Sequence, residues 1–415
     1  MIKKIQGEIR FFNEMPRDMR ILLMTNMIYA LVLPIIEIFV SAYIMRSLNS
    51  SSAVILYQIT VFTGIPITFV LNGFLLRKFS VKGLYSLGMI LSGISISVMM
   101  FLKDITFVEV GISGLLMGIS YGFFWSNRDF LAIETTEDNN RNYYYGLETF
   151  FYTITGIAVP AVIGFLFVLT SSYNLFDGDA TAVYRVITIA VFLLTVLSSI
   201  VIHRGSFKNP KVDRIIYFRF DKLWRKLLVL ASLKGMTQGY LVTVPAILIL
   251  RLVGDESTLS SVQSISGIVT AIVLYVLGRI SKPQHRIYIF SLGYVIFFVG
   301  ALTHSLLFSS FGVIVFVMCK VLYQPLHDIA YFPIQMKVIN YLSELTKRSE
   351  FSYIVNHEFG LYVGRFLGLS LFIVLDYYIS ESFAIRYSLV VIGIIQMLSI
   401  PLAKTIIQES KHEKA

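Results

Sequence analysis

Twelve long apolar runs divide this 415-residue chain, and they recur from Ile21 to Ala403. A helix needs roughly 20 apolar residues to cross the hydrocarbon core of a bilayer, which is about 30 Å thick. The composition agrees, because 56% of the residues are hydrophobic and only 14% are charged. In water such a chain would expose large apolar surfaces, so we expect the bilayer to be its solvent.

We therefore predict an all-α polytopic membrane protein with twelve transmembrane helices. The first run is too long for a cleaved signal peptide, so we expect it to be retained as a helix. The predicted spans are, in chain order, 21–45, 52–76, 84–102, 105–125, 150–169, 183–202, 227–250, 259–277, 287–307, 311–334, 351–374 and 383–403.

Lys and Arg residues crowd into every second connection between the runs. About 27 of the 35 lie in the two termini and in connections 2–3, 4–5, 6–7, 8–9 and 10–11. The positive-inside rule then places both termini in the cytoplasm. An even number of spans also requires the termini to share a side. These loops account for the net charge of +10, so the charge predicts no nucleic-acid partner.

A basic connection from His203 to Lys226 divides the chain near its midpoint. We predict a six-helix bundle over residues 1–203, a basic cytoplasmic linker over 204–226 and a second six-helix bundle over 227–415. The two bundles should be pseudo-symmetric, an arrangement common in secondary transporters.

Small residues recur at four-residue spacing in the fifth run of each half. Four residues make a little over one helical turn, so each set lines one helix face and lets a neighbouring helix approach closely. The matching positions favour a duplicated unit, and generic helix packing is the alternative. The two sets are Gly156, Pro160 and Gly164, and Gly360, Gly364 and Gly368.

The loop between the second and third runs reads GFLLRKFSVK over residues 73–82. It resembles the Gly-x-x-x-Asp-Arg-x-Gly-Arg-Arg loop of the major facilitator superfamily, although Arg77 stands at the aspartate position and Ser80 at the second glycine. Gly73 and the basic residues match. With six plus six spans and a basic linker, the chain resembles this family over nearly its whole length. The resemblance implies a secondary transporter in which this loop helps to latch the halves on the cytoplasmic side.

Cations within the predicted spans are candidates for substrate binding. A charge at the bilayer centre costs about 2.5–3.5 kcal/mol on insertion scales, so it usually faces a cavity or a partner. Lys234, Lys320 and Arg365 all lie in the second half, and arginine suits a planar carboxylate or phosphate. We expect them to attract an anionic group. Alternatively, they pair with nearby carboxylates and brace the second half.

Three carboxylates within the spans are candidates for proton coupling, namely Glu37, Asp328 and Glu358. A carboxyl group removed from water binds a proton more readily, as a proton-coupled carrier requires. Glu37 follows Pro34, which can loosen the helix at that point.

Polar and aromatic neighbours complete the predicted substrate site. Gln238 lies one helical turn from Lys234, and Gln324 lies one turn from Lys320. Tyr121 and Trp125 are four residues apart and could line the mouth of a cavity. An aromatic belt at the membrane interface explains Trp125 equally well.

Three charged residues near the basic side receive structural interpretations. We expect Arg128 and Asp129 at the membrane edge, in a salt bridge between the two halves. Glu148 is interpreted as a capping residue at the start of the fifth helix, where a negative charge is favourable.

Enzymatic function is not predicted. Most external connections are under roughly ten residues, too short for the loop-borne catalytic clusters that polar chemistry needs. The chain carries no phosphate-cradling loop, metal-binding His-Glu pair or nucleophile elbow. Cys319 is the only cysteine, so we expect no disulfide, and we predict no metal site and no cofactor.

Together these features predict a secondary active transporter that moves a small amphipathic or anionic organic solute by alternating access with proton coupling. A multidrug exporter of lipophilic cations is one alternative, and a non-transporting receptor or lipid scramblase is another. The expected partners are the solute, protons and the lipid bilayer, and the chain is expected to be a monomer. Short connections and the lack of disulfides suit a bacterial inner (plasma) membrane.

Overall fold

The computed structural model describes residues 12–101, 105–136, 138–174, 179–209, 220–280, 283–348 and 350–412. Every regular element in these residues is a helix. Twelve helices among them are long and apolar enough to cross a membrane. The prediction of an all-α protein with twelve spans is therefore confirmed. Residues 210–219 of the predicted basic linker lie outside the described residues.

The first and the last spans each consist of more than one helical segment, whereas the other spans are single helices. The elements are α2 (Arg17–Ala30), η1 (Ile35–Phe39) and α3 (Val40–Leu48), then α4 (Ser51–Leu75), α5 (Val81–Phe101), α6 (Phe107–Thr135), α7 (Asp138–Ser172), α8 (Ala180–Ile202), α9 (Lys222–Leu252), α10 (Glu256–Ile280), α11 (Arg286–Leu307), α12 (Ser310–Thr346) and α13 (Glu350–Tyr378), and finally α14 (Glu381–Gln396) and α15 (Ser399–His412).

Serine caps set the first residues of several helices. The side chains of Ser50, Ser309 and Ser380 accept hydrogen bonds from backbone N–H groups in the first turns of α4, α12 and α14. Such caps satisfy donors that a helix start leaves without a partner. They place three tight turns on one side of the molecule.

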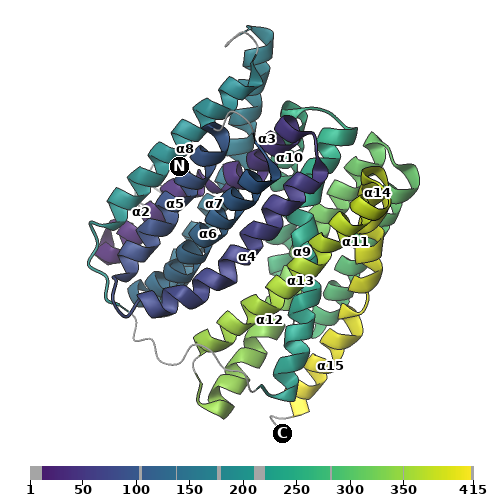
Figure 1. Cartoon of the computed structure of the whole chain (residues 1–415). Helices are drawn as coiled ribbons and strands as arrows, with labels where there is room; N and C mark the ends of the chain where they lie inside the picture. Colours follow the sequence, from purple (N-terminus) through teal and green to yellow (C-terminus); the bar gives the residue numbers. More distant parts are fainter. Residues whose placement is uncertain are drawn as a thin grey trace.

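Figure 1 shows two groups of helices side by side, α2 to α8 in purple to teal and α9 to α15 in green to yellow. Within the first group α4 and α5 pack on α6, and within the second group α9 packs on α13 and α11 on α12. Contacts between the groups run mainly through α4 with α13 and through α7 with α10. We call the two groups the first and second halves.

The two glycine sets make different contacts. A Cβ at Gly364 would lie 1.7 Å from the backbone oxygen of Ser232, so α13 approaches α9 of its own half very closely. A Cβ at Gly164 would lie 2.5 Å from the Cβ of Ser260, on α10 of the other half. The expected close packing does not hold at Gly156, where a Cβ would meet no heavy atom within 4 Å.

The loops alternate between two faces of the molecule. The connections α4–α5, α6–α7, α8–α9, α10–α11 and α12–α13 correspond to those predicted to be basic, and they mark one face, here called the basic face. The remaining connections mark the opposite face.

Polar contacts between the halves gather at the opposite face. Arg46 Nη1 of α3 lies 2.7 Å from Glu256 Oε1 of α10. Arg251 at the end of α9 donates to the side-chain and backbone oxygens of Asn49, each at 2.6 Å. Ser52 of α4 donates to Asp376 of α13. These contacts hold the halves together on that side.

Candidate functional site

The first span is interrupted in its middle, as expected at Pro34. The α2 helix ends at Ala30, and residues Ile35–Phe39 form a π-helical segment before α3 begins. Proline lacks a backbone N–H and disturbs the regular hydrogen bonding, and single-turn π segments are frequent at functional sites. This segment carries Glu37, whose side chain is exposed even though it lies midway along the span.

A cavity of about 560 Å³ lies between the two halves. Its volume is typical of a small-molecule site. The wall is built from α2, η1, α6 and α7 of the first half and from α9, α10 and α12 of the second. Eight of the residues singled out from the sequence line it: Glu37, Trp125, Gly156, Lys234, Gln238, Lys320, Gln324 and Asp328.

A second cavity, of about 310 Å³, adjoins the first. The two share Glu37, Trp125, Gln238 and Val242 as lining residues. The other lining residues are mostly apolar or aromatic side chains of α4 and α6, Phe62 among them. Three further residues singled out from the sequence line this cavity: Tyr121, Glu358 and Arg365. The predicted substrate and proton residues are thus brought together around two connected spaces.

Lys234 is one of two cavity cations that have protein partners. Its Nζ lies 3.4 Å from Asp328 Oδ1 and 4.1 Å from the ring centroids of both Tyr331 and Phe332. Asp328 Oδ1 is also 3.0 Å from Nδ1 of His327. The lysine charge is therefore held by one carboxylate and two aromatic faces.

Arg365 is the second paired cation. Its Nη1 lies 2.5 Å from Glu358 Oε1, and its Nη2 donates to Gln238 Oε1 at 2.9 Å. The guanidinium also lies 4.7 Å from the ring centroid of Phe62, a residue of the other half. For Lys234 and Arg365 the bracing alternative therefore describes the contacts that are present.

Lys320 and Glu37 are different, because neither forms a hydrogen bond or an ion pair within the described part of the chain. Glu37 is exposed and Lys320 is half-buried, so the cavity is open to both side chains. Both side chains line the first cavity. Glu37 comes from the first half and Lys320 from α12 of the second.

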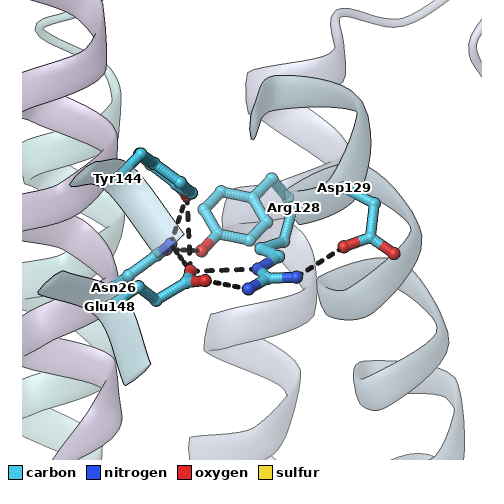
Figure 2. A network of polar contacts seen from close by, with 6 residues as sticks. Asn26, Arg128, Asp129, Tyr144 and Glu148 are labelled. Atoms are coloured by element: carbon cyan, nitrogen blue, oxygen red, sulfur yellow. Dashed lines mark hydrogen bonds and ion pairs between the residues drawn. The ribbon is translucent and has the colours of Figure 1, made fainter. Parts of the chain in front are cut away.

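A buried polar network lies near the basic face of the first half, and Figure 2 shows how it converges on one carboxylate. Glu148 of α7 accepts from Arg128 Nε at 3.0 Å and from Asn26 Nδ2 at 2.6 Å. Asn26 also donates to the Tyr144 hydroxyl at 3.0 Å. Arg128 makes a further ion pair with Asp129, at 2.7 Å.

This network corrects two expectations. Arg128 and Asp129 form no salt bridge between the halves, because the partners shown in Figure 2 all belong to the first half. Glu148 is not a cap, since α7 already begins at Asp138 and the Glu148 side chain is 2% exposed. Its negative charge is neutralised by Arg128 inside the half.

The two loop residues singled out by the family motif lie at the end of α4. Gly73 is buried in its last turn. Arg77 is exposed, and its guanidinium lies 5.6 Å from the ring centroid of Phe74.

Several residues of the site escaped the sequence analysis. Gln263 of α10 and Tyr152 of α7 line the first cavity. A polar amide in an otherwise apolar span was a usable signal for Gln263. The sequence gives no such signal for aromatic residues such as Tyr152, because they are common throughout membrane helices.

The described residues contain no group of three or more His, Cys, Asp or Glu side chains able to hold a metal ion. Cys319 is half-buried, and a Cβ at Gly300 would lie 2.5 Å from its Cβ. The thiol therefore faces a helix contact between α11 and α12.

Comparison with known sequences gives one family and two relatives. A family model described as Major Facilitator Superfamily matches residues 22–369. The uncharacterized protein YqgE of Bacillus subtilis (strain 168) is 23% identical over 397 residues, which cover 95% of this chain and 90% of that protein. An uncharacterized protein encoded in the sodM 3′ region of Geobacillus stearothermophilus is 24% identical over 164 residues, 40% of this chain and 75% of its own length.

Solved structures share the fold at low sequence identity. A bacterial homolog of the human lysosomal transporter Spinster, in an inward-facing and occupied conformation, has a TM-score of 0.65 at 12% identity and covers 94% of this chain and 96% of its own. A POT family transporter in complex with a thioalcohol-conjugated peptide has a TM-score of 0.69 at 11% identity, and one in complex with 5-aminolevulinic acid has 0.69 at 12%. Both cover 94% of this chain and 97% of their own.

Proposed function

This chain belongs to the major facilitator superfamily, and from that premise we propose that its central cavity carries a small organic solute with an anionic group. The chain is a multi-pass membrane protein and a secondary transporter, not an enzyme. We place it in the inner membrane of a bacterium as a monomer, with the basic face and both termini in the cytoplasm. The two relatives are bacterial, and the positive-inside rule supports this orientation.

The observation that carries the anionic substrate is the free ammonium group of Lys320. Lys234 and Arg365 each have a carboxylate partner, whereas Lys320 lines the cavity with no such partner among the described residues. A cation away from bulk water gains most from a partner of opposite charge, and in this cavity only a ligand supplies one within hydrogen-bond reach. The ligands named for the POT family structures are likewise small organic molecules.

Transport follows if the halves rock about this site. The contacts at the opposite face, such as Arg46 with Glu256, keep that side closed in the present conformation. The reverse conformation requires these contacts to break and the basic face to close. We propose that the solute enters the cavity from the cytoplasmic side while the opposite face is closed.

Proton coupling is assigned to Asp328 among the three candidate carboxylates. A coupling group must change another interaction when it binds a proton. Asp328 is partly exposed to the cavity, and its protonation would release both Lys234 and His327. Glu358 is held more tightly, at 2.5 Å from Arg365, and is less exposed.

The coupling assignment is tested in proteoliposomes with an imposed pH gradient. Asp328→Asn should abolish uphill accumulation of the solute while leaving solute exchange across the membrane intact. Glu358→Gln is the matched control, since it also neutralises a cation-paired carboxylate, and it should keep uphill accumulation. Uphill accumulation by Asp328→Asn at the wild-type level would sink the assignment.

The anionic class is tested by thermal stabilisation of the purified protein in detergent. A ligand that binds only the folded state raises its melting temperature by mass action. Small organic anions should stabilise the wild type and Lys320→Arg, and should lose their effect on Lys320→Gln. Stabilisation by anions that is equal in all three proteins would contradict the proposal.

A second candidate function is favoured by the carboxylate of Glu37, which lines both cavities together with Trp125 and has no ion-pair partner among the described residues. An anionic and aromatic wall is suited to a lipophilic cation. Stabilisation by lipophilic cations alone, lost in Glu37→Gln, would favour a multidrug exporter over the anion carrier.

A further inference from the structure

Two charged groups of opposite sign line the central cavity without an ion-pair or hydrogen-bond partner in the part of the chain that the structure describes. They are the Glu37 carboxylate and the Lys320 ammonium, and both are accessible from the cavity. Charges placed within a membrane span are costly and are usually paired. The neighbouring cations follow that rule, since Lys234 and Arg365 are ion-paired. The exception formed by Glu37 and Lys320 therefore calls for a ligand that satisfies both.

The two free charges do not satisfy each other. Both line the same cavity, but no ion pair within 4.0 Å joins them. The cavity that they line has a volume of about 560 Å³, enough to hold a molecule of several heavy atoms. A ligand with one charge would leave the other group without a partner.

We propose that the solute is a zwitterion of amino-acid to dipeptide size, whose acidic group binds Lys320 and whose ammonium group binds Glu37. This inference rests on the proposed function and narrows its substrate class. An ammonium donates hydrogen bonds to a carboxylate, and a carboxylate accepts them from a lysine, so each contact is charge-assisted. The solute carries no net charge and leaves neither cavity group unpaired.

The second cavity supplies room for an apolar side chain on the solute. It opens beside Glu37 and Trp125, which line both spaces, and its far wall includes Tyr57, Phe62 and Tyr121. Burying an apolar group there adds affinity without a further charge. A zwitterion with a leucine-like or aromatic side chain is therefore expected to bind better than glycine.

Binding of this kind also links the two halves. Glu37 belongs to the first half and Lys320 to the second, so a zwitterion between them joins the halves through its two ends. A singly charged analogue can reach only one half. The zwitterion is therefore expected to favour the closing movement that alternating access requires.

The chain contains a built-in reporter for this test. It has two tryptophans, and Trp125 lines both cavities while Trp224 is fully buried in α9. Ligand binding should change the fluorescence of Trp125. The variant Trp224→Phe isolates this signal, and Trp125→Phe should remove it.

The probes are L-leucine and L-leucyl-L-alanine, each with its N-acetyl derivative, which lacks the ammonium, and its C-terminal amide, which lacks the carboxylate. At least one free zwitterion should bind the Trp224→Phe protein, and both blocked forms should bind about tenfold more weakly or worse, because each loses one charge-assisted contact. Glu37→Gln should remove the discrimination against the N-acetyl form only. Lys320→Gln should remove the discrimination against the amide only.

This crossed pattern distinguishes residues that contact the ligand from residues with a structural role. A purely structural change would weaken the discrimination against the N-acetyl form and against the amide together. Equal binding of the N-acetyl and free forms would overturn the zwitterion and leave an anion carrier, so the proposed function would survive. Equal binding of the amide and free forms would favour a cation carrier and overturn both proposals. Failure of both zwitterions to bind would also overturn this inference, and stabilisation by simple anions would then decide the proposed function separately.

Discussion

Glu37 and Lys320 face one cavity from opposite halves of the molecule, and neither has an ion-pair partner in the described chain. In the same region Arg365 lies 2.5 Å from Glu358, and Lys234 lies 3.4 Å from Asp328. The contrast divides the charged residues of the site into two groups. The paired residues hold the second half together, and the free residues are available to a ligand.

Removing a paired cation should therefore cost stability, whereas removing a free cation should not. Arg365→Ala leaves Glu358 as an uncompensated carboxylate that is 18% exposed, and the expected loss is about 3–5 kcal/mol in the free energy of unfolding. Lys320→Ala should be neutral or stabilising. Thermal unfolding in detergent compares the two. Equal losses would mean that Lys320 has a structural partner that the present conformation does not contain.

The Arg128–Glu148 pair should behave as a unit. Each single change, Arg128→Leu or Glu148→Leu, leaves a buried charge and should destabilise the protein by about 3–5 kcal/mol. The double variant should cost less than the sum, because no charge is then left unpaired. Asp129→Asn, at a side chain that is 47% exposed, is the control and should have little effect. Strict additivity in this cycle would argue against the pairing.

Two glycines of matching sequence pattern should respond differently to alanine. Gly364→Ala would place a methyl group 1.7 Å from the backbone oxygen of Ser232, so the packing of α13 on α9 must open. The expected cost is about 1–3 kcal/mol or more, as for overpacking of a core. Gly156→Ala meets open space and should leave the melting temperature unchanged. Loss of stability in Gly156→Ala alone would contradict this packing.

Breaking the contacts at the opposite face should shift the population toward the reverse conformation. Arg46→Gln removes the ion pair with Glu256. The Arg46 side chain is 46% exposed. An exposed pair contributes roughly 0.2–1 kcal/mol, so the open fraction on this side should rise about 1.5- to 5-fold. Spin labels at Ser47 and Ser261, in a background lacking Cys319, measure the distance distribution across the face.

The control for that measurement is Arg386→Gln. Arg386 lies at the same face, but it donates to the backbone oxygen of Ser305 within its own half. The distance distribution should not change. A shift of equal size in the control would show that any loss of charge at this face opens it.

Hydropathy predicted the number and order of the spans but not where the helices end. The α7 helix begins at Asp138 rather than near Phe150, and α12 continues to Thr346. The bilayer determines only the length of the apolar segment, and a helix can continue into polar sequence beyond it. This difference explains why Glu148, placed at a helix start from the sequence, lies well inside α7.

Which charged residues line the candidate cavities could be predicted from the sequence, but the ion pairs that they form could not. Charged residues in apolar spans mark a cavity or a partner, and this principle identified Glu37, Lys320 and Asp328. Which cation meets which carboxylate depends on how separate helices pack. Lys234 of α9 forms an ion pair with Asp328 of α12. Lys320 lies on the same helix as Asp328 but forms no ion pair within the described residues. Helical periodicity relates residues within one helix and carries no information about such contacts.

The most direct test of solute transport through Lys320 is uptake by the purified protein in proteoliposomes. The solute is the probe that gives the largest fluorescence change at Trp125, supplied in labelled form on the outside with unlabelled solute inside. We expect saturable exchange by the wild type, partial exchange by Lys320→Arg and no exchange by Lys320→Gln, with all three proteins equally folded. Exchange by Lys320→Gln at the wild-type rate, or no saturable exchange by the wild type, would contradict this expectation.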